Sequence, residues 1–452
     1  MMDRASFQHP SSLYQTHDRC LLFSTLALVV FGALMIYSST SVVTPTLAKK
    51  GATEFYYFKR HLFTILIGLC FMFFACTFRP SFLRKIAIPL LLVSFVLLLL
   101  VFLPGIGVQV NGAKRWIRLW PSTFQPSEFV KLSMVIFLAR YLSSQAFRTE
   151  SFASFIKPVA IMIAFQAIML MQPDFGAAMS LAFLTITMLF LSGTRLRYIL
   201  SLALFALPIL FILIREPYRL RRIISFLDPW KDPLGSGFQL VQSFIAFGSG
   251  GITGVGIGGS KQKLSYLPES HTDFIFSIIG EEFGFIGVSV IIALFVLIFF
   301  RGFSIANRTQ DKFTYYLAVG LSLMISVQAL VNFAVATGLV PTKGLPLPFI
   351  SYGGSSLLMN MAAIGILLNI SRGKDYPEPD NMRIKMVARR KAISAKYKNE
   401  NEQIHYKAAR HKVCHSGSSG IFLHEEGFPT SGNDNSTRND LLNPDSKRRG
   451  TP

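Results

Sequence analysis

Acidic side chains are concentrated where an apolar segment near residue 273 begins. Glu269, His271 and Asp273 lie at its mouth, and Glu281 and Glu282 follow about two helical turns further in. Asp273 suits a helix start, where free backbone N–H groups and the helix dipole stabilise a carboxylate. It also suits a general base, because the dipole keeps it ionised while partial desolvation raises its proton affinity. Position alone favours the helix start, so the surrounding groups must decide between the two.

The adjacent acids Glu281 and Glu282 are costly inside a membrane span, at a few kcal/mol each. Successive helix residues point about 100° apart, so the two side chains cannot both face lipid. We expect at least one of them to meet a cation from another span, and Lys131 is the best buried candidate. An internal ion pair and a role in proton or substrate handling both explain such acids.

Cations alternate with aromatic rings in a second polar region, which holds Lys114, Arg115 and Arg118 beside Trp116 and Trp120. This composition is typical of a belt at the membrane interface. Alternatively, these Lys and Arg side chains bind a phosphate group, which Arg can do with paired donors.

Three further motifs interrupt the apolar pattern. Gln125-Pro-Ser-Glu128 has the proline and the early acid of a first helical turn. Gln172-Pro-Asp-Phe-Gly176 predicts a tight turn, although turn chemistry alone does not account for Asp174 at the bilayer edge. Segment 341–356 contains Lys343, three prolines and a glycine pair, and such broken backbone is tolerated at membrane depth where it lines a cavity or is buried in protein.

The composition excludes an ordinary soluble globule, because 51% of the residues are hydrophobic and only 15% are charged. The formal net charge of +21 lies in loops and in the tail, where anionic lipid headgroups are the nearer partner, so nucleic-acid binding is not needed to explain it. No phosphate-binding Gly-Lys-Ser/Thr motif and no metalloprotease spacing occurs.

Ten apolar segments are long enough to cross a bilayer core of about 30 Å. They are residues 20–39, 61–78, 86–103, 127–144, 156–171, 176–192, 198–214, 273–299, 314–337 and 349–370. The fold class is therefore an all-α polytopic membrane protein of about ten transmembrane helices. We expect a short tail (1–19), a membrane domain (20–370) and a basic, largely disordered tail (371–452).

An even number of spans puts both termini on one side, and basic residues identify that side as the cytoplasm. Seven such residues follow the last span closely: Arg372, Lys374, Arg383, Lys385, Arg389, Arg390 and Lys391. Loop 215–272, between the seventh and eighth segments, is then extracytoplasmic, and its length is typical of a functional loop. Its net charge of +3 on the side that disfavours cations predicts an anionic partner.

Taken in order, these motifs resemble the shape, elongation, division and sporulation family of bacterial peptidoglycan glycosyltransferases over about residues 15–372. The resemblance is carried by Leu267-Pro-Glu-Ser-His-Thr-Asp273, Ile279-Gly-Glu-Glu282, Lys114-Arg-Trp116, Gln125-Pro-Ser-Glu128, Gln172-Pro-Asp174 and Ile350-Ser-Tyr-Gly-Gly-Ser-Ser356. Three further segments look more like the division-type than the elongation-type member: Asp228-Pro-Trp-Lys-Asp-Pro233, Gln262-Lys-Leu264 and Pro341-Thr-Lys-Gly344.

The resemblance implies that lipid II is polymerised into β-1,4 glycan outside the cytoplasmic (inner) membrane, for septal wall synthesis. Asp273, matching the family's catalytic acid, would deprotonate the acceptor hydroxyl in an inverting displacement. A diphosphate leaving group is a weak base and needs cations rather than a general acid. Glu281 and Glu282 would be structural intramembrane charges. Substrate contacts are expected from Lys114, Arg115, Glu128, Lys131, Asp174, Gln239, Lys263, Glu269, His271, Lys343, Ser351 and Ser355.

The resemblance also implies the nascent glycan, a class B penicillin-binding protein, other division proteins and membrane lipids as partners. The sequence requires no cofactor, although a divalent cation such as Mg²⁺ or Mn²⁺ could share the work. Two rival functions stay open. Intramembrane charges and broken helices also suit a transporter that moves lipid II across the bilayer, and a non-enzymatic scaffold that recruits a transpeptidase needs no catalysis.

Overall fold

The computed structural model describes residues 17–40, 56–110, 113–119, 122–263, 271–373 and 394. The chain divides into two units, Met1–Tyr376 and Pro377–Pro452, and every element below belongs to the first. Nearly all of the predicted tails, 1–19 and 371–452, lies outside the described residues.

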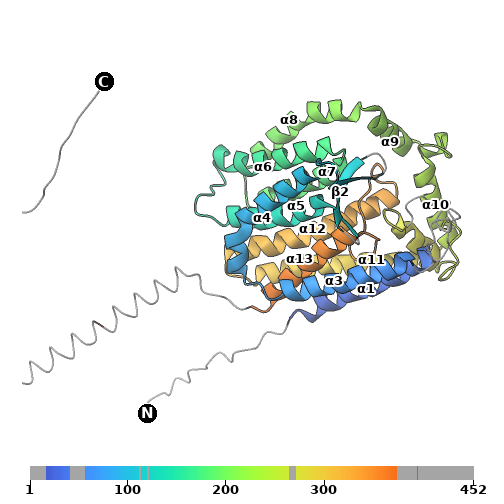
Figure 1. Cartoon of the computed structure of the whole chain (residues 1–452), viewed down its shortest axis with the longest axis horizontal. Helices are drawn as coiled ribbons and strands as arrows, with labels where there is room; N and C mark the ends of the chain where they lie inside the picture. The colour runs from blue at the N-terminus through green and yellow to red at the C-terminus, as the bar shows by residue number, and fades with distance from the viewer. Residues whose placement is uncertain are drawn as a thin grey trace, which may run out of the picture. The chain divides into compact units, whose positions relative to one another are not determined.

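Ten long helices run side by side in this unit (Figure 1). They are α1 (Arg19–Thr40), α3 (Tyr56–Ala75), α4 (Pro80–Leu100), α5 (Pro126–Leu142), α6 (Phe152–Met171), α7 (Phe175–Leu191), α8 (Leu196–Ile214), α11 (Ile275–Asn307), α12 (Lys312–Ala336) and α13 (Gly354–Ser371). Each corresponds to one of the ten predicted apolar segments, so the all-α polytopic prediction is confirmed.

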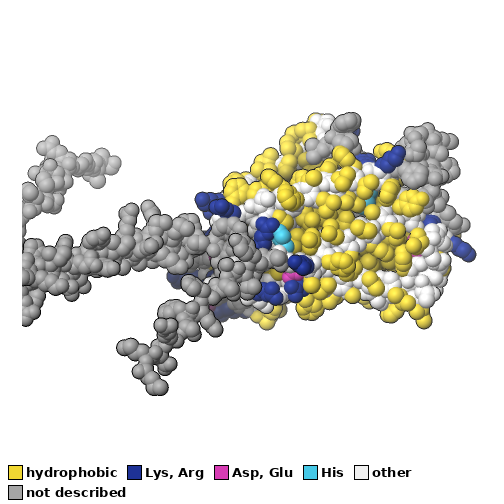
Figure 2. Space-filling view, turned by 90° about the horizontal axis from the view of Figure 1, so that it is seen from below, with side chains coloured by type: hydrophobic (Ala, Val, Ile, Leu, Met, Phe, Trp, Pro, Cys, Tyr) yellow, Lys and Arg dark blue, Asp and Glu magenta, His cyan; other side chains and the backbone are white. Residues whose placement is uncertain are grey.

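Eight of these described helices are long and apolar enough to cross a membrane. The other two, α5 and α7, have 17 residues each, which is the lower limit for a transmembrane helix. In α5 the apolar pattern is interrupted by Glu128, Lys131 and Arg140. Hydrophobic side chains cover the face of the helical unit shown in Figure 2, as expected of a surface that meets lipid.

Local sequence signals explain where several helices begin. Pro80 and Pro126 occupy the first turns of α4 and α5, where proline has the right backbone angle and its missing N–H is not needed. Asp174 and Asp311 cap α7 and α12 by accepting hydrogen bonds from the backbone N–H groups of Ala177 and Thr314. The core lies where α12 packs against α5 and α11, and where α13 packs against α3.

A three-stranded antiparallel sheet connects α4 to α5, and the sequence analysis did not predict it. Its strands are β1 (Gly107–Val110), β2 (Ala113–Leu119) and β3 (Ser122–Phe124), in the order β1-β2-β3. Gly107 pairs with Ile117, which in turn pairs with Phe124. The segment predicted as an interfacial belt therefore lies on a strand, so its successive side chains point to opposite faces of the sheet.

The described part of loop 215–272 folds into α9 (Pro217–Leu227), a 3₁₀ turn η1 (Pro229–Lys231) and α10 (Phe238–Gly250). Its last turns are joined to α11, which breaks at Gly284 with φ 63° and ψ −162°. Backbone groups around the break bond with the loop instead: Val255 donates to the Glu281 carbonyl at 3.0 Å, and Phe285 donates to that of Gly251 at 2.9 Å. The loop thereby satisfies polar groups that a broken helix leaves open.

Candidate active site

Asp273 lies in a turn before α11, whose first helical residue is Ile275. Phe274 occupies the N-cap position, so Asp273 lies one residue before the cap of this helix. The residue is half-buried, so its carboxyl group is neither fully solvated nor sealed in the core. This environment is the one expected of a general base.

The wall beside Asp273 is the segment that joins α12 to α13. A Cβ atom at Gly344 would lie only 2.9 Å from Asp273 Oδ2, so the carboxylate rests against the main chain of Gly344. The next residue back, Lys343, packs over Gly176 and is close enough to Asp174 for the two charges to interact. One short segment therefore contacts the surroundings of both carboxylates.

Asp174 is almost fully buried and is held by several donors. Its Oδ1 accepts from the backbone N–H of Ala177 at 3.1 Å, and its Oδ2 accepts from Gln125 Nε2 at 3.0 Å and Ser127 Oγ at 3.3 Å. The Arg115 guanidinium lies 3.9 Å from Oδ1. The bond to Ala177 explains why an acid occupies this turn. Arg115 and Lys343 place positive charge beside the Asp174 carboxylate.

A buried polar network lies among α5, α12 and α13. The Lys131 ammonium lies 2.8 Å from Glu128 Oε1 and donates to Gln328 Oε1 at 2.7 Å. Gln328 then donates to the carbonyl of Pro346 at 2.9 Å and to Ser356 Oγ at 2.8 Å. Glu128 is thus more than an early helix acid: its ion pair fixes the helices that carry the 341–353 segment.

The structure corrects the expected partner of the intramembrane acids. Glu282 pairs at 3.3 Å with Lys263, which lies on loop 215–272 and not in another span. Ser38 of α1 donates to both Glu282 carboxylate oxygens, at 2.6 and 2.8 Å. Lys131 is not available to them, because it lies beside Glu128.

Glu281 holds the loop by hydrogen bonds to neighbouring residues. Its carboxylate accepts from the Ser260 hydroxyl and from the backbone N–H groups of Lys261 at 2.9 Å and Gln262 at 3.4 Å. Glu281 and Glu282 are both buried, and both bond residues 260–263 of loop 215–272 to α11. Their predicted structural role agrees with this geometry.

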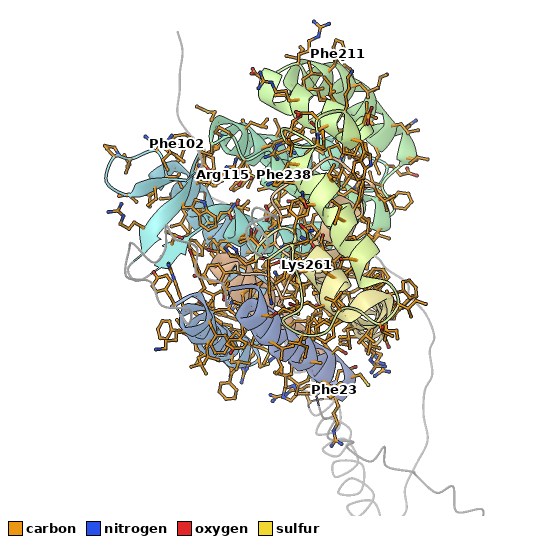
Figure 3. The ribbon with its side chains drawn as sticks, turned by 90° about the vertical axis from the view of Figure 1, so that its right-hand side faces the viewer. Phe23, Phe102, Arg115, Phe211, Phe238 and Lys261 are labelled. Atoms are coloured by element: carbon orange, nitrogen blue, oxygen red, sulfur yellow. The ribbon has the colours of Figure 1, made fainter. Side chains whose placement is uncertain are left out.

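The strand β2 presents its cations at the end of the helices where the outer loop lies. Figure 3 looks onto this end, with Arg115 on the sheet and Lys261 on the loop, while Phe23 of α1 and Phe211 of α8 lie at opposite margins. Lys114 and Arg118 are exposed, whereas Arg115 is half-buried beside Asp174. Of the three cations, Arg115 is the one that the structure brings to the candidate site.

Three more of the predicted substrate contacts lie within the described residues, namely His271, Gln239 and Ser355. The His271 ring packs against Tyr57 and Tyr352 at centroid distances of 5.5 and 5.8 Å, and Gln239 is half-buried on α10. Ser355 is buried and accepts a hydrogen bond from the backbone N–H of Gln125 at 2.8 Å. Glu269 lies outside the described residues.

Ser351 does not occupy the position expected of a substrate ligand. It is buried, and its hydroxyl donates to the Thr272 carbonyl at 2.6 Å and accepts from the Leu347 N–H at 2.7 Å. Both bonds are made to backbone, so Ser351 supports the site from beneath. Lys263 is buried and pairs with Glu282, and its role as a substrate contact stays a prediction.

Burial lowers the pKa of the Lys343 ammonium to about 8. The positive charge of Lys131 acts in the same direction, while the negative charge of Asp174 opposes both. Lys343 is therefore charged at neutral pH and loses its proton just above it.

Within the described residues, no three His, Cys, Asp or Glu side chains converge as a metal-binding group. The expectation of a divalent cation is therefore not tested by this part of the chain. The charges that the structure does bring to the site are carboxylates and basic side chains.

The arrangement combines the half-buried Asp273 carboxylate with two cations, Lys343 and Arg115, that lie near Asp174. Asp273 can take a proton from a hydroxyl group, and Lys343 and Arg115 can stabilise an anionic leaving group. A water-poor setting strengthens both effects because charges interact more strongly in a low dielectric.

Three residues of this site were not predicted: Gln125, Gln328 and Asn332. Each is a polar amide that joins separate helices or loops through hydrogen bonds. Gln328 and Asn332 are spaced four apart on an apolar helix, so they share one face, and that spacing was the signal available in the sequence. Gln125 is part of a recognised motif, but only the structure reveals its bond to Asp174.

Comparisons with known proteins agree with this geometry. The family model described as cell cycle protein, covering FtsW, RodA and SpoVE, matches residues 18–376. A relative named probable peptidoglycan glycosyltransferase FtsW, from Geobacter sulfurreducens, is 45% identical over 359 residues, which cover 79% of this chain and 95% of the relative. Stage V sporulation protein E of Bacillus subtilis is 41% identical over 361 residues, which cover 79% of this chain and 98% of the relative.

Two solved structures are also similar. One is described as structural coordination of polymerization and crosslinking by a peptidoglycan synthase complex, and the matching chain is 29% identical with a TM-score of 0.65, covering 80% of this chain and 99% of that chain. Rod shape determining protein RodA of Thermus thermophilus is 28% identical with a TM-score of 0.59, covering 79% and 98%.

Proposed function

We propose that this chain polymerises lipid II with Asp273 as the general base. The chain belongs to the FtsW, RodA and SpoVE family of cell cycle proteins and is a peptidoglycan glycosyltransferase. The observation that carries the mechanism is a half-buried Asp273 carboxylate resting against Gly344, with Lys343 adjacent. A glycosyl transfer to a sugar hydroxyl needs such a base to remove the hydroxyl proton.

In the proposed reaction Asp273 accepts the proton of the acceptor sugar's 4-hydroxyl as its oxygen attacks the anomeric carbon of the donor. The bond from that carbon to the diphosphate breaks, and the configuration inverts in a single displacement. The diphosphate leaves as a weak base, so it requires cations but no protonation. Lys343 and Arg115 carry positive charge beside Asp174. This charge favours both side chains as ligands of the leaving diphosphate.

The position in the membrane is part of the proposal. We place both termini in the cytoplasm and the site on the outer face, since seven basic residues follow the last span closely. Septal wall synthesis is favoured because the relatives at 45% identity are named FtsW. A transpeptidase of the penicillin-binding class is the proposed partner, since a similar chain was solved within a synthase complex that couples polymerization and crosslinking.

The decisive experiment measures glycan formation from lipid II by the purified full chain and by Asp273→Asn. Asn keeps the size of Asp and cannot accept the proton, so we expect polymer formation to fall by about 10²- to 10⁴-fold. Thermal unfolding should be unchanged between the two proteins.

Equal polymer from a folded Asn variant would refute the mechanism. Transfer of lipid II across proteoliposomes without polymer would identify a transporter instead, a reading that the broken helix α11 also suits. Polymer that forms only with the transpeptidase present would identify an enzyme that its partner activates.

A further inference from the structure

Three consecutive carbonyl groups in the turn before α11 accept hydrogen bonds from two neighbouring parts of the chain. The carbonyl of His271 accepts from the backbone N–H of Tyr352 at 2.9 Å, and that of Thr272 accepts from Ser351 Oγ at 2.6 Å. The Asp273 carbonyl accepts from Asn332 Nδ2 at 2.9 Å. The turn is thus fixed residue by residue from α12 and from the segment before α13.

Helical bonding does not hold the backbone of Asp273 in the same way. The first carbonyl of α11 to accept a helical bond is that of Phe274, which bonds the N–H of Ser277 at 3.0 Å. Asp273 precedes that point, so contacts from outside the helix add to those that fix its backbone. Asn332 provides such a contact.

Asn332 uses one amide nitrogen to join two backbone segments. The same Nδ2 that donates to the Asp273 carbonyl also donates to the carbonyl of Leu345 at 2.8 Å. Leu345 follows Gly344, whose main chain lies against the Asp273 carboxylate. The side chain therefore sets the spacing between the carboxylate and the wall on which it rests.

The burial of Asn332 indicates that these donated bonds explain its presence. The residue is 1% exposed, and its Oδ1 accepts no hydrogen bond within the described part of the chain. An unpaired buried oxygen is destabilising, and an apolar side chain of similar size would avoid that cost. An amide at this position is accounted for by its two N–H donors.

We propose that Asn332 is a positioning residue for Asp273, which keeps the carboxylate at the distance from Gly344 and Lys343 that proton removal requires. This inference rests on the proposed function, because it assigns a role relative to the general base. Asn332 does not touch the substrate; it acts through the backbone of the turn. A misplacement of about 1 Å in such a group costs about 100-fold in rate.

The test compares Asn332→Ala and Asn332→Asp with the unmodified full chain, using lipid II polymerisation and thermal unfolding. We expect kcat to fall about 10- to 100-fold in both variants while KM changes less than about twofold, because substrate ligands are untouched. In Asn332→Asp, the carboxylate repels the two carbonyl groups, whereas its protonated form donates one hydrogen bond. The ratio of variant to unmodified activity should therefore rise as pH falls.

Gln166→Ala is the matched control. Gln166 also joins two helices, by donating from its amide to the Ala178 carbonyl at 3.0 Å, and it does not contact the 271–273 turn. A loss of packing and one interhelical bond should lower its thermal stability without the fall in kcat or the change in pH profile.

Two outcomes separate this inference from the proposed function. If Asp273→Asn is inactive and the folded Asn332→Asp variant has an unmodified kcat across the pH range, the positioning role is refuted and the mechanism stands. If Asp273→Asn retains full activity, the mechanism itself is refuted. Should Asn332→Ala fail to fold, the Asp variant, which has the same size as Asn, still decides the question.

Discussion

Helix α8 and the helix pair α12 and α13 are all apolar, yet the protein uses them in opposite ways. Within an apolar stretch of 18 residues in each helix, 67% of α12 and 78% of α13 is buried inside the protein, compared with 0% of α8. The mean hydropathy of the stretch runs the other way, at 2.3 in α8, 1.9 in α12 and 1.4 in α13. The most apolar helix of the three is therefore the one that packs least against protein.

The difference follows from the solvent. Lipid tails are as apolar as leucine, so apolar content gives a helix no reason to leave the lipid, whereas polar groups need partners within the protein. The buried faces of α12 and α13 carry Gln328, Asn332 and Ser355, and these residues bond to the segments around the candidate site. Polar residues thus mark which helices hold the chemistry.

The largest expected effect comes from breaking the buried Glu128–Lys131 ion pair, whose lysine also bonds to Gln328 of α12. Lys131→Met leaves the Glu128 carboxylate buried without its cation, and we expect a loss of about 3–5 kcal/mol in the free energy of unfolding. Thermal or denaturant unfolding in detergent measures it. The double variant Lys131→Met with Glu128→Leu should recover part of the loss, and a single variant as stable as the unmodified protein would show that the pair does not hold α5.

A leucine in each region gives a smaller and matched comparison. Leu367 of α13 is 0% exposed and Leu204 of α8 is 68% exposed. Leu367→Ala should cost about 2 kcal/mol, mostly from the cavity it leaves, because lipid already removes much of the hydrophobic term. Leu204→Ala should cost less than about 0.5 kcal/mol. Equal effects in unfolding measurements would mean that α8 packs against protein in solution.

The smallest expected effect concerns the charge of Lys343, which lies beside Asp174. Because burial lowers the pKa of Lys343 to about 8, its ammonium is present below that pH and is lost as the pH rises through it. At pH 9 about a tenth of the molecules keep the charge, so kcat/KM for lipid II should fall about tenfold between pH 7 and pH 9.

Lys343→Arg supplies the control for this pH effect, since Arg stays charged throughout the range. Its profile of kcat/KM should stay flat above pH 8, although the absolute value depends on how well the larger guanidinium fits. Parallel profiles for the two proteins would exclude Lys343 as the titrating group.

The helices of this fold were predictable from the sequence, because each apolar segment is long enough to cross a bilayer and is bounded by turn residues. The sheet at residues 107–124 was not predicted, because β2 carries three cations around Trp116, a composition that also suits the membrane interface. Asp273 was selected because its motif resembles that of the family, and its catalytic role stays a prediction.

Partners within the site were harder to predict. Lys131 was assigned to the acids on α11, but it lies one helical turn from Glu128, and the cation that Glu282 meets comes from the outer loop. Hydropathy identifies spans without showing which spans are neighbours. The bonds of Asn332 to two backbone carbonyls likewise depend on the path of the 341–353 segment.

The interruption of α11 at Gly284 has a consequence for biosynthesis. Residues 251–256 and 281–286 exchange backbone hydrogen bonds. The backbone polar groups of each segment therefore find these partners only when the other segment is present. A ribosome makes the loop first, and its partners appear only when the chain beyond residue 286 has emerged. This end of the protein, which holds the candidate site, is therefore completed late, after most of the membrane-spanning segments have been synthesised.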